Sequence, residues 1–203
     1  MSKVDGTILY PGEEFDLAKT VSPFTQENGY ELAGAYQNGT VVESFGGGIC
    51  QVATTLYNAV IRAELEITMR FNHSMLVHYV EPSMDAAIAG NYKDLKFKNN
   101  LDAPVYIEGY CSGGIIYFNV YGKETRPSNR EISFESETVS KTDPKVQFTM
   151  DASLTAGSVS VTQSGQSGCI AQLWKIVKVD GKQQSRDPVS YTHLRAHETD
   201  QYL

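Results

Sequence analysis

The clearest hydrophobic pattern in the chain follows three consecutive glycines, in the stretch SFGGGICQVATTLYNAVIRAELEI at residues 44–67. Apolar side chains recur there at spacings of three and four residues, and polar side chains fall on the opposite side. The apolar positions are Ile49, Val52, Ala53, Leu56, Tyr57 and Val60. This spacing predicts a helix over residues 49–63 with one buried face.

The rest of the first 123 residues shows the shorter period of strands, interrupted by turn formers. Strands are predicted at TVVESF before the glycines, and at LEITMRF, SMLVHYV and DLKFKNN after the helix. A hairpin is predicted around Ser112–Gly114, and tight turns are predicted at Pro11-Gly12, Asn28-Gly29 and Asn38-Gly39. We therefore predict an α+β domain at residues 1–123, with one central helix packed on a mostly antiparallel sheet.

A second unit is predicted after a polar segment. Residues 124–130 contain Pro127 and no apolar run, which is typical of a linker. Residues 131–188 alternate apolar and polar positions without a helical period, with Gly157, Gly165 and Gly168 between the apolar runs. This pattern predicts a small all-β module.

The C-terminal segment, residues 189–203, is excluded from this fold prediction. Its stretch VSYTHLRAHET at residues 189–199 resembles the translation of a sequencing adapter, and such a tail carries no information about the fold. We then expect the β module to be truncated, and any membrane anchor to have been lost with missing parts of the chain. His193 and His197 drop out as candidate site residues, which leaves His73 and His78.

Composition limits the partners and cofactors of the chain. Its 203 residues are 41% apolar and 20% charged, a balance that supports a folded core. The formal net charge of -7 argues against a nucleic-acid partner, because phosphate binding requires clustered Lys and Arg. There is no long apolar run to span a membrane, and no signal segment is visible. Cys50, Cys111 and Cys169 form no CxxC pair, and neither an HExxH motif nor a Cys/His cluster is present, so we expect no metal and no cofactor.

Cys50 is the residue whose position suggests chemistry. It lies in the first turn of the predicted helix, where unpaired N–H groups and partial positive charge favour the thiolate. Gly46, Gly47 and Gly48 permit a tight bend and the close approach of a substrate backbone. Gln51 places an amide near the same point. These four residues are candidates for substrate binding.

A thiol nucleophile also requires a base and a group that orients the base. His73 lies between Asn72 and Ser74 and is the candidate in a polar context, whereas His78 lies in an apolar run and is expected to be packed. Asp85 follows and completes the order Cys, His, Asp. Two interpretations stay open: a catalytic triad, or a buried thiol with Asp85 in a turn.

Five stretches, in chain order, resemble the VanW-like family and together cover roughly residues 5–123. They are ILYPGEEFDL, ENGYELAGAYQNG, GGGICQVATTLYNAV, MRFNHSMLVHYVEPSMDAAI and DLKFKNNLDAPVYI. The family takes its name from a vancomycin-resistance gene cluster. The resemblance implies an extracytoplasmic protein of the Gram-positive cell envelope, and it leaves the biochemical activity open.

The predicted β module resembles a G-five domain, a small β module named for its glycines. Gly157, Gly165, Gly168 and Gly181 fit its pattern, with the stretch GSVSVTQSGQSGCIAQLWKIVKVDGK. This resemblance implies a cell-wall glycan or a peptidoglycan peptide as the partner.

The stretch GICQVATTLYNAVIRAELEITMR, followed by His and Asp, is similar to the core of transglutaminase-like thiol enzymes. The similarity implies Cys50 as the nucleophile, His73 as the base and Asp85 as the orienting group. The short interval from Cys to His departs from that pattern, as does Glu64 where a helix-ending glycine is common. Two functions follow: an envelope module associated with peptidoglycan, or a thiol enzyme that acts on amide bonds there.

Overall fold

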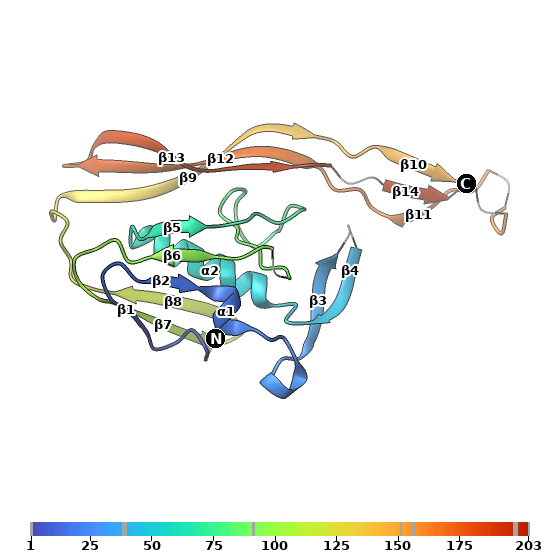
Figure 1. The fold of residues 1–203 in the computed structure, drawn as a ribbon. Coiled ribbons are helices and arrows are strands. Elements are labelled where there is room, and N and C mark those ends of the chain that lie inside the picture. The colour runs from blue at the N-terminus through green and yellow to red at the C-terminus, as the bar shows by residue number, and fades with distance from the viewer. Residues whose placement is uncertain are drawn as a thin grey trace.

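Figure 1 shows the fold of the chain in a computed structural model. The structure describes residues 2–37, 40–90, 92–150, 152–155, 157–196 and 199–202. The protein is mostly β, with 45% strand and 12% helix. The predicted turn at Asn38-Gly39 lies outside the described residues.

The predicted α+β class, with one central helix on a mostly antiparallel sheet, is therefore wrong. The described strands form several small sheets in place of one. Turns interrupt the apolar runs, so the strands of this part are short. One example is the turn at Pro11-Gly12, which follows the first strand and in which Gly12 has a positive φ of 84°. The stretch SMLVHYV, predicted as a strand, forms none and follows an irregular path up to Pro82.

The N-terminal part contains three small sheets, and all their strand pairs are antiparallel. One sheet has the order β1-β7-β8, with β1 Thr7–Leu9, β7 Val105–Ser112 and β8 Ile115–Tyr121. The second has the order β2-β6-β5, with β2 Glu14–Asp16, β6 Lys96–Lys98 and β5 Glu66–Met69. The third is the pair β3 Leu32–Gln37 and β4 Thr40–Phe45.

The helices of this part are α1 Leu17–Val21, a 3-10 turn at Gln26–Asn28, and α2 Ile49–Arg62. The predicted long helix and the predicted β7–β8 hairpin are confirmed, and each follows a sustained periodic pattern in the sequence. The apolar face of α2 is buried in one cluster with Leu17, Phe97 and Ile107. No helix among the described residues is long and apolar enough to cross a membrane.

The C-terminal part consists of two three-stranded sheets. The first has the order β13-β12-β9, with β9 Arg130–Thr142, β12 Gly168–Val179 and β13 Lys182–Leu194. The second has the order β10-β14-β11, with β10 Val146–Thr149, β14 Thr199–Tyr202 and β11 Ser160–Gln163. Of the segment at residues 189–203, β13 pairs with β12 as far as Leu194, and His197, Glu198 and Leu203 lie outside the described residues.

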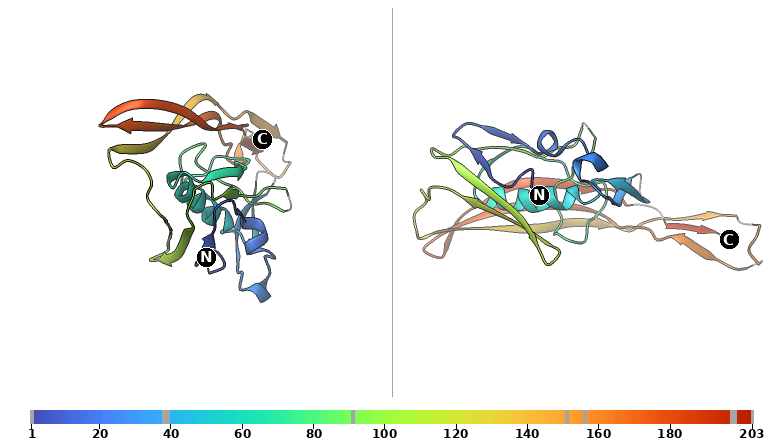
Figure 2. Two further views of the ribbon diagram at one scale, coloured as in Figure 1. Left: turned by 60° about the vertical axis from the view of Figure 1, so that its left-hand side comes forward. Right: turned by 90° about the horizontal axis from the view of Figure 1, so that it is seen from below.

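The β13-β12-β9 sheet and the β7–β8 hairpin lie on opposite sides of α2 (Figures 1 and 2). Leu173 of β12 is fully buried in the apolar cluster of the N-terminal part, and Phe134 of β9 packs against the same cluster. The Arg62 guanidinium lies 5.8 Å from the centre of the Phe134 ring. The two parts of the chain therefore share a core.

Glu64 joins the two parts by charge. Its carboxylate accepts hydrogen bonds from Arg130, at 2.6 and 2.8 Å, and from Lys175. Its backbone has a positive φ of 61°, a conformation that glycine usually occupies at the end of a helix. The hydrogen bonds of Arg130 outweigh burial and lower the pKa of Glu64 to about 2, with Lys175 adding to the effect. The ion pairs explain why a glutamate occupies this strained position.

Replacing Glu64 with glutamine is expected to lower the free energy of unfolding at pH 7 by roughly 1–3 kcal/mol, because Arg130 and Lys175 lose an anionic partner. A folded pKa below the ordinary 4.5 means that this stability is present above pH 4.5 and is lost as the pH falls toward 2. Urea unfolding of both proteins at pH 7 and pH 2.5 measures the difference. Glu135→Gln is the control, since Glu135 is an exposed carboxylate 3.8 Å from Arg186. A difference between Glu64→Gln and wild type that does not change with pH contradicts this assignment.

Candidate active site

The glycines before Cys50 make the turn from β4 into α2. Gly46 has a positive φ of 82°, and a Cβ atom there would lie 3.0 Å from the Phe24 ring. At Gly47 a Cβ would lie 2.5 Å from the carbonyl oxygen of Ala33 on β3. Packing within the chain thus requires both glycines. Gly48, the N-cap of α2, has no atom within 4 Å of such a Cβ, and it is exposed, as is Gln51.

Cys50 is half-buried in the first turn of α2, and its Sγ lies 3.5 Å from the carbonyl oxygen of Ile88. Burial alone would raise the pKa of the thiol. A side-chain hydrogen bond with His73, the backbone of Ile88 and the positive charges of His73 and Lys93 outweigh burial, and they lower the pKa of Cys50 below its ordinary value. The surroundings of Cys50 therefore favour the thiolate.

His73 is buried and is held by Asp85 at two points. Its ring Nδ1 lies 2.7 Å from Oδ2 of Asp85, and its backbone N–H donates to the same oxygen at 2.7 Å. Asp85 engages Nδ1, and the second ring nitrogen, Nε2, lies 3.3 Å from the Tyr79 hydroxyl. The structure thus brings together Cys50, His73 and Asp85, the three residues that the sequence proposed as a triad.

The pKa of His73 is raised to about 9. Burial opposes this rise, but the hydrogen bonds with Asp85 and Cys50 and the charges of both groups outweigh it. A raised pKa on the imidazole and a lowered pKa on the thiol favour the same charge state, an imidazolium beside a thiolate. Cysteine nucleophiles require this state, because the thiolate is the attacking form.

Arg70 completes the network, and the sequence prediction did not assign it a role. Its Nη2 lies 2.6 Å from Oδ1 of Asp85, and its Nε donates to the backbone oxygen of Asp85 at 2.7 Å. The guanidinium also lies 5.6 Å from the centre of the Tyr57 ring on α2. Burial would raise the pKa of Asp85, but His73 and Arg70 lower it. Arg70 thereby keeps Asp85 ionised and fixes its direction.

Two further residues contact the site from segments without a periodic pattern. The Tyr79 hydroxyl lies 3.3 Å from Nε2 of His73. Lys93 donates to the backbone oxygen of Asn72 at 2.9 Å and adds positive charge near the thiol. His78 is exposed, so the expectation that it would be packed is wrong. Residues 70–82 do not form a strand, so their side chains do not alternate between two faces of a sheet.

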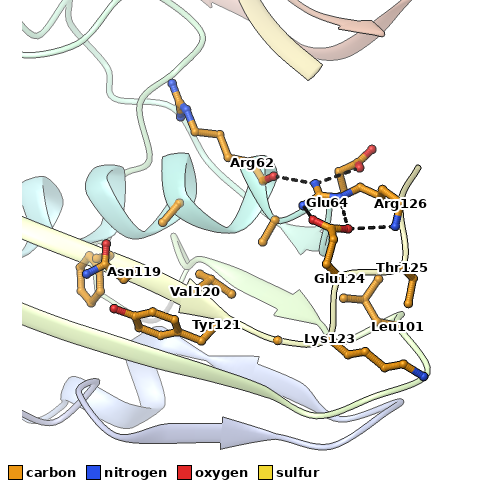
Figure 3. A pocket seen from close by; sticks show the side chains of 14 residues that line it. Arg62, Glu64, Leu101, Asn119, Val120, Tyr121, Lys123, Glu124, Thr125 and Arg126 are labelled. Carbon is orange, nitrogen blue, oxygen red and sulfur yellow. Dashed lines mark hydrogen bonds and ion pairs between the residues drawn. The ribbon is translucent and has the colours of Figure 1, made fainter. Parts of the chain in front are cut away.

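A separate cavity of about 470 Å³ lies at the other end of α2 (Figure 3). It is lined by Arg62, Glu64, the end of β8 and the connection from Lys123 to Arg126. None of Cys50, His73 and Asp85 lines this cavity. Arg126, the central cation of its wall, is paired with Glu124 and Glu64. Among the residues that the structure describes, no group of three His, Cys, Asp or Glu side chains is placed to hold a metal ion.

A family model described as VanW like protein matches residues 1–121, more than half of the chain and the whole of the candidate site. The chain belongs to this family. A G5 domain model matches residues 134–201, so the VanW domain is followed by a G5 domain. Both resemblances seen in the sequence are confirmed.

Two curated relatives match the VanW domain. An uncharacterized protein, YoaR of Bacillus subtilis, is 36% identical over 60% of this chain and 40% of its own length. The vancomycin B-type resistance protein VanW of Enterococcus faecalis is 27% identical over 51% of this chain and 40% of its own length. The chain therefore spans about 40% of the length of each of these relatives.

Two solved G5 structures match 36% of this chain. The G5 domain of IgA1 protease is 24% identical, with 88% of that chain covered and a TM-score of 0.26. HP0197-G5 is 25% identical, with 96% of that chain covered and a TM-score of 0.22.

The raised pKa of His73 predicts a specific titration. In wild type the His73 ring should titrate near pH 9, and in Cys50→Ser it should titrate at lower pH, because a neutral hydroxyl replaces the thiolate. A folded pKa above the ordinary 6.5 also means that the stabilisation is fully present below pH 6.5 and is lost as the pH rises through 9. NMR of the imidazole C–H resonances measures the titration, and His78→Gln assigns the signals. Titration of His73 near 6.5 in wild type would rule out the thiolate–imidazolium pair.

Proposed function

We propose that this VanW-family protein is associated with peptidoglycan in the cell envelope and acts there as a thiol-dependent enzyme on amide bonds. The family and the G5 domain support the association with the envelope. The enzymatic proposal is supported by one arrangement: Cys50 lies in the first turn of α2 with its pKa lowered by His73, and the His73 ring is held by Asp85, which Arg70 contacts in turn. In this arrangement each group has the role that a cysteine nucleophile requires.

In the proposed reaction the Cys50 thiolate attacks the carbonyl carbon of an amide. The amide C–N bond breaks, and the His73 imidazolium gives its proton to the departing nitrogen, which leaves a thioester on Cys50. A water molecule or a second amine, deprotonated by His73, then attacks the thioester and releases the thiol. The first outcome is hydrolysis and the second is acyl transfer, and neither requires an oxidant or a cofactor.

The first turn of α2 contributes one group for the developing oxyanion. The N–H groups of Ile49, Gln51 and Val52 donate to the carbonyl oxygens of Gly46 and Gly48. The Cys50 N–H has no acceptor among the described residues, and it points from the same turn as the nucleophile. It is therefore the amide that we assign to the oxyanion. The exposed backbone of Gly48 and the Gln51 side chain form the side from which a substrate would approach.

A non-catalytic envelope module is the second candidate function. Its support is the packing of Gly46 and Gly47, which explains two of the three turn glycines without a substrate. In that case Cys50 contributes to the core of the site loop, and the ion pair of Arg70 and Asp85 has a structural role alone.

Thiol reactivity separates these candidates. In a Cys111→Ser background, which removes the exposed thiol, Cys50 should react with iodoacetamide at pH 5.5 at least about tenfold faster than free cysteine, because a larger fraction is thiolate. His73→Ala should abolish this advantage, whereas His78→Ala should leave it unchanged. A rate equal to that of free cysteine, or one insensitive to His73, argues for the non-catalytic module.

The reaction itself is tested by trapping the thioester. Incubation with peptidoglycan fragments that carry stem peptides should add an acyl mass at Cys50, and hydroxylamine should remove it, because thioesters react readily with that nucleophile. Intact mass spectrometry followed by peptide mapping locates the adduct. Cys50→Ser and His73→Ala are the controls. A reactive Cys50 that forms no adduct with any peptidoglycan amide would refute this substrate class.

A further inference from the structure

Four tyrosines lie on the outer face of the β7–β8 hairpin, and none of them belongs to the Cys50 site. Tyr106 and Tyr110 on β7 stand opposite Tyr121 and Tyr117 on β8, respectively. Their exposed fractions range from 38% to 53%. We call this set the tyrosine platform. The opposite face of the hairpin carries Val105 and Ile107, which are buried, so folding of the hairpin requires apolar side chains on that face alone.

The platform consists of two cross-strand ring pairs. Tyr110 and Tyr117 are stacked, with ring centres 4.9 Å apart and an angle of 12° between the planes. Tyr106 and Tyr121 are tilted by 35°, with centres 6.1 Å apart. Side chains on one face of a strand lie side by side with period two, and the four residue steps from Tyr106 to Tyr110 span roughly 13 Å. The rings thus form two apolar surfaces along the hairpin.

A polar pair separates the two ring pairs on the same face. Glu108 and Asn119 are opposite each other in the register, and Nδ2 of Asn119 donates to Oε2 of Glu108 at 2.8 Å. The Tyr121 hydroxyl donates to the same oxygen at 3.0 Å. Among the described contacts, Oε1 of Glu108 and the amide oxygen of Asn119 accept no hydrogen bond, so both are acceptors for a ligand. The platform therefore alternates apolar surface, polar groups and apolar surface.

We propose that the tyrosine platform binds a linear glycan. A pyranose ring presents a flat face of C–H groups and a rim of hydroxyl groups. The C–H face suits a tyrosine ring, and the hydroxyl rim suits a carboxylate and an amide between the rings. The spacing of the two ring pairs matches a short run of linked sugars rather than a single ring. This site is separate from the thiol chemistry proposed for Cys50 and does not depend on it.

Charge argues against nucleic acid as the occupant. Bases also stack on exposed aromatic side chains, but single-stranded nucleic acids require a positively charged groove for the phosphates. Here the centre of the platform is the carboxylate of Glu108, and the chain has a formal net charge of -7. A neutral polymer with many hydroxyl groups avoids this repulsion.

Chitohexaose, a linear hexamer of N-acetylglucosamine, is the probe for the test. Isothermal titration calorimetry on the full chain should detect binding, and Tyr110→Ala/Tyr117→Ala should weaken it by at least about tenfold, because the stacked pair is removed. Tyr110→Phe/Tyr117→Phe keeps both rings and should bind within about threefold of wild type. Thermal unfolding of each variant shows that the hairpin is intact.

Two control variants decide the interpretation. Tyr92→Ala removes a tyrosine that is 70% exposed outside the platform, and it should leave binding unchanged. Cys50→Ala should also bind normally, which separates this proposal from the enzymatic one. Binding that is unaffected by the double alanine substitution overturns the proposal, since the glycan would then be held elsewhere, for example by the G5 domain. Three other results also overturn the proposal. The wild type does not bind chitohexaose, or it prefers polyuridylate, or sedimentation velocity shows tyrosine-dependent dimers without glycan binding.

Discussion

The buried carboxylate of Asp85 is the interaction on which the candidate site depends. It accepts hydrogen bonds from the His73 backbone and from Arg70, and its Oδ2 lies 2.7 Å from the His73 ring. Through Arg70 it is linked to the Tyr57 ring of α2, and through His73 to the thiol at the start of the same helix. A buried carboxylate is tolerated only when it is paired in this way. The charge of Asp85 thus holds the irregular loop at residues 70–85 against α2, together with the hydrogen bond from Asn58 of α2 to the backbone oxygen of Met84.

A structural ion pair and a catalytic one would share most of this geometry. Arg70 and Asp85 alone would stabilise the loop, and His73 could serve as a neutral spacer. The two cases differ in their use of Cys50, because only the catalytic case uses the raised pKa of the imidazole and the lowered pKa of the thiol. Structural ion-pair networks also shift pKa values, so the reactivity of the thiol decides between the two cases.

Periodic patterns predicted their elements correctly, and the irregular segment SMLVHYV was wrongly predicted as a strand. The apolar stripe from Ile49 to Val60 and the hairpin around Gly113 extend over enough residues for a period to emerge. The short strands at TVVESF, LEITMRF and DLKFKNN were also predicted, but their patterns do not reveal that they belong to several small sheets in place of one. Chemical context proposed Cys50, His73 and Asp85 as one triad. It assigned no role to Arg70 or Tyr79, because their contacts cross an irregular loop.

The arrangement of layers makes the two proposals physically compatible. The helix α2 lies between the β13-β12-β9 sheet and the β1-β7-β8 sheet, and Glu64 fixes the first of these sheets at the end of α2 opposite to Cys50 (Figure 1). The tyrosine platform faces away from this shared core, so a glycan could occupy it without displacing any of the contacts that position His73. Binding and chemistry would then use different faces of the same domain. A polymer held on the platform would raise the local concentration of its own side groups near Cys50 without any change in the geometry of the thiol.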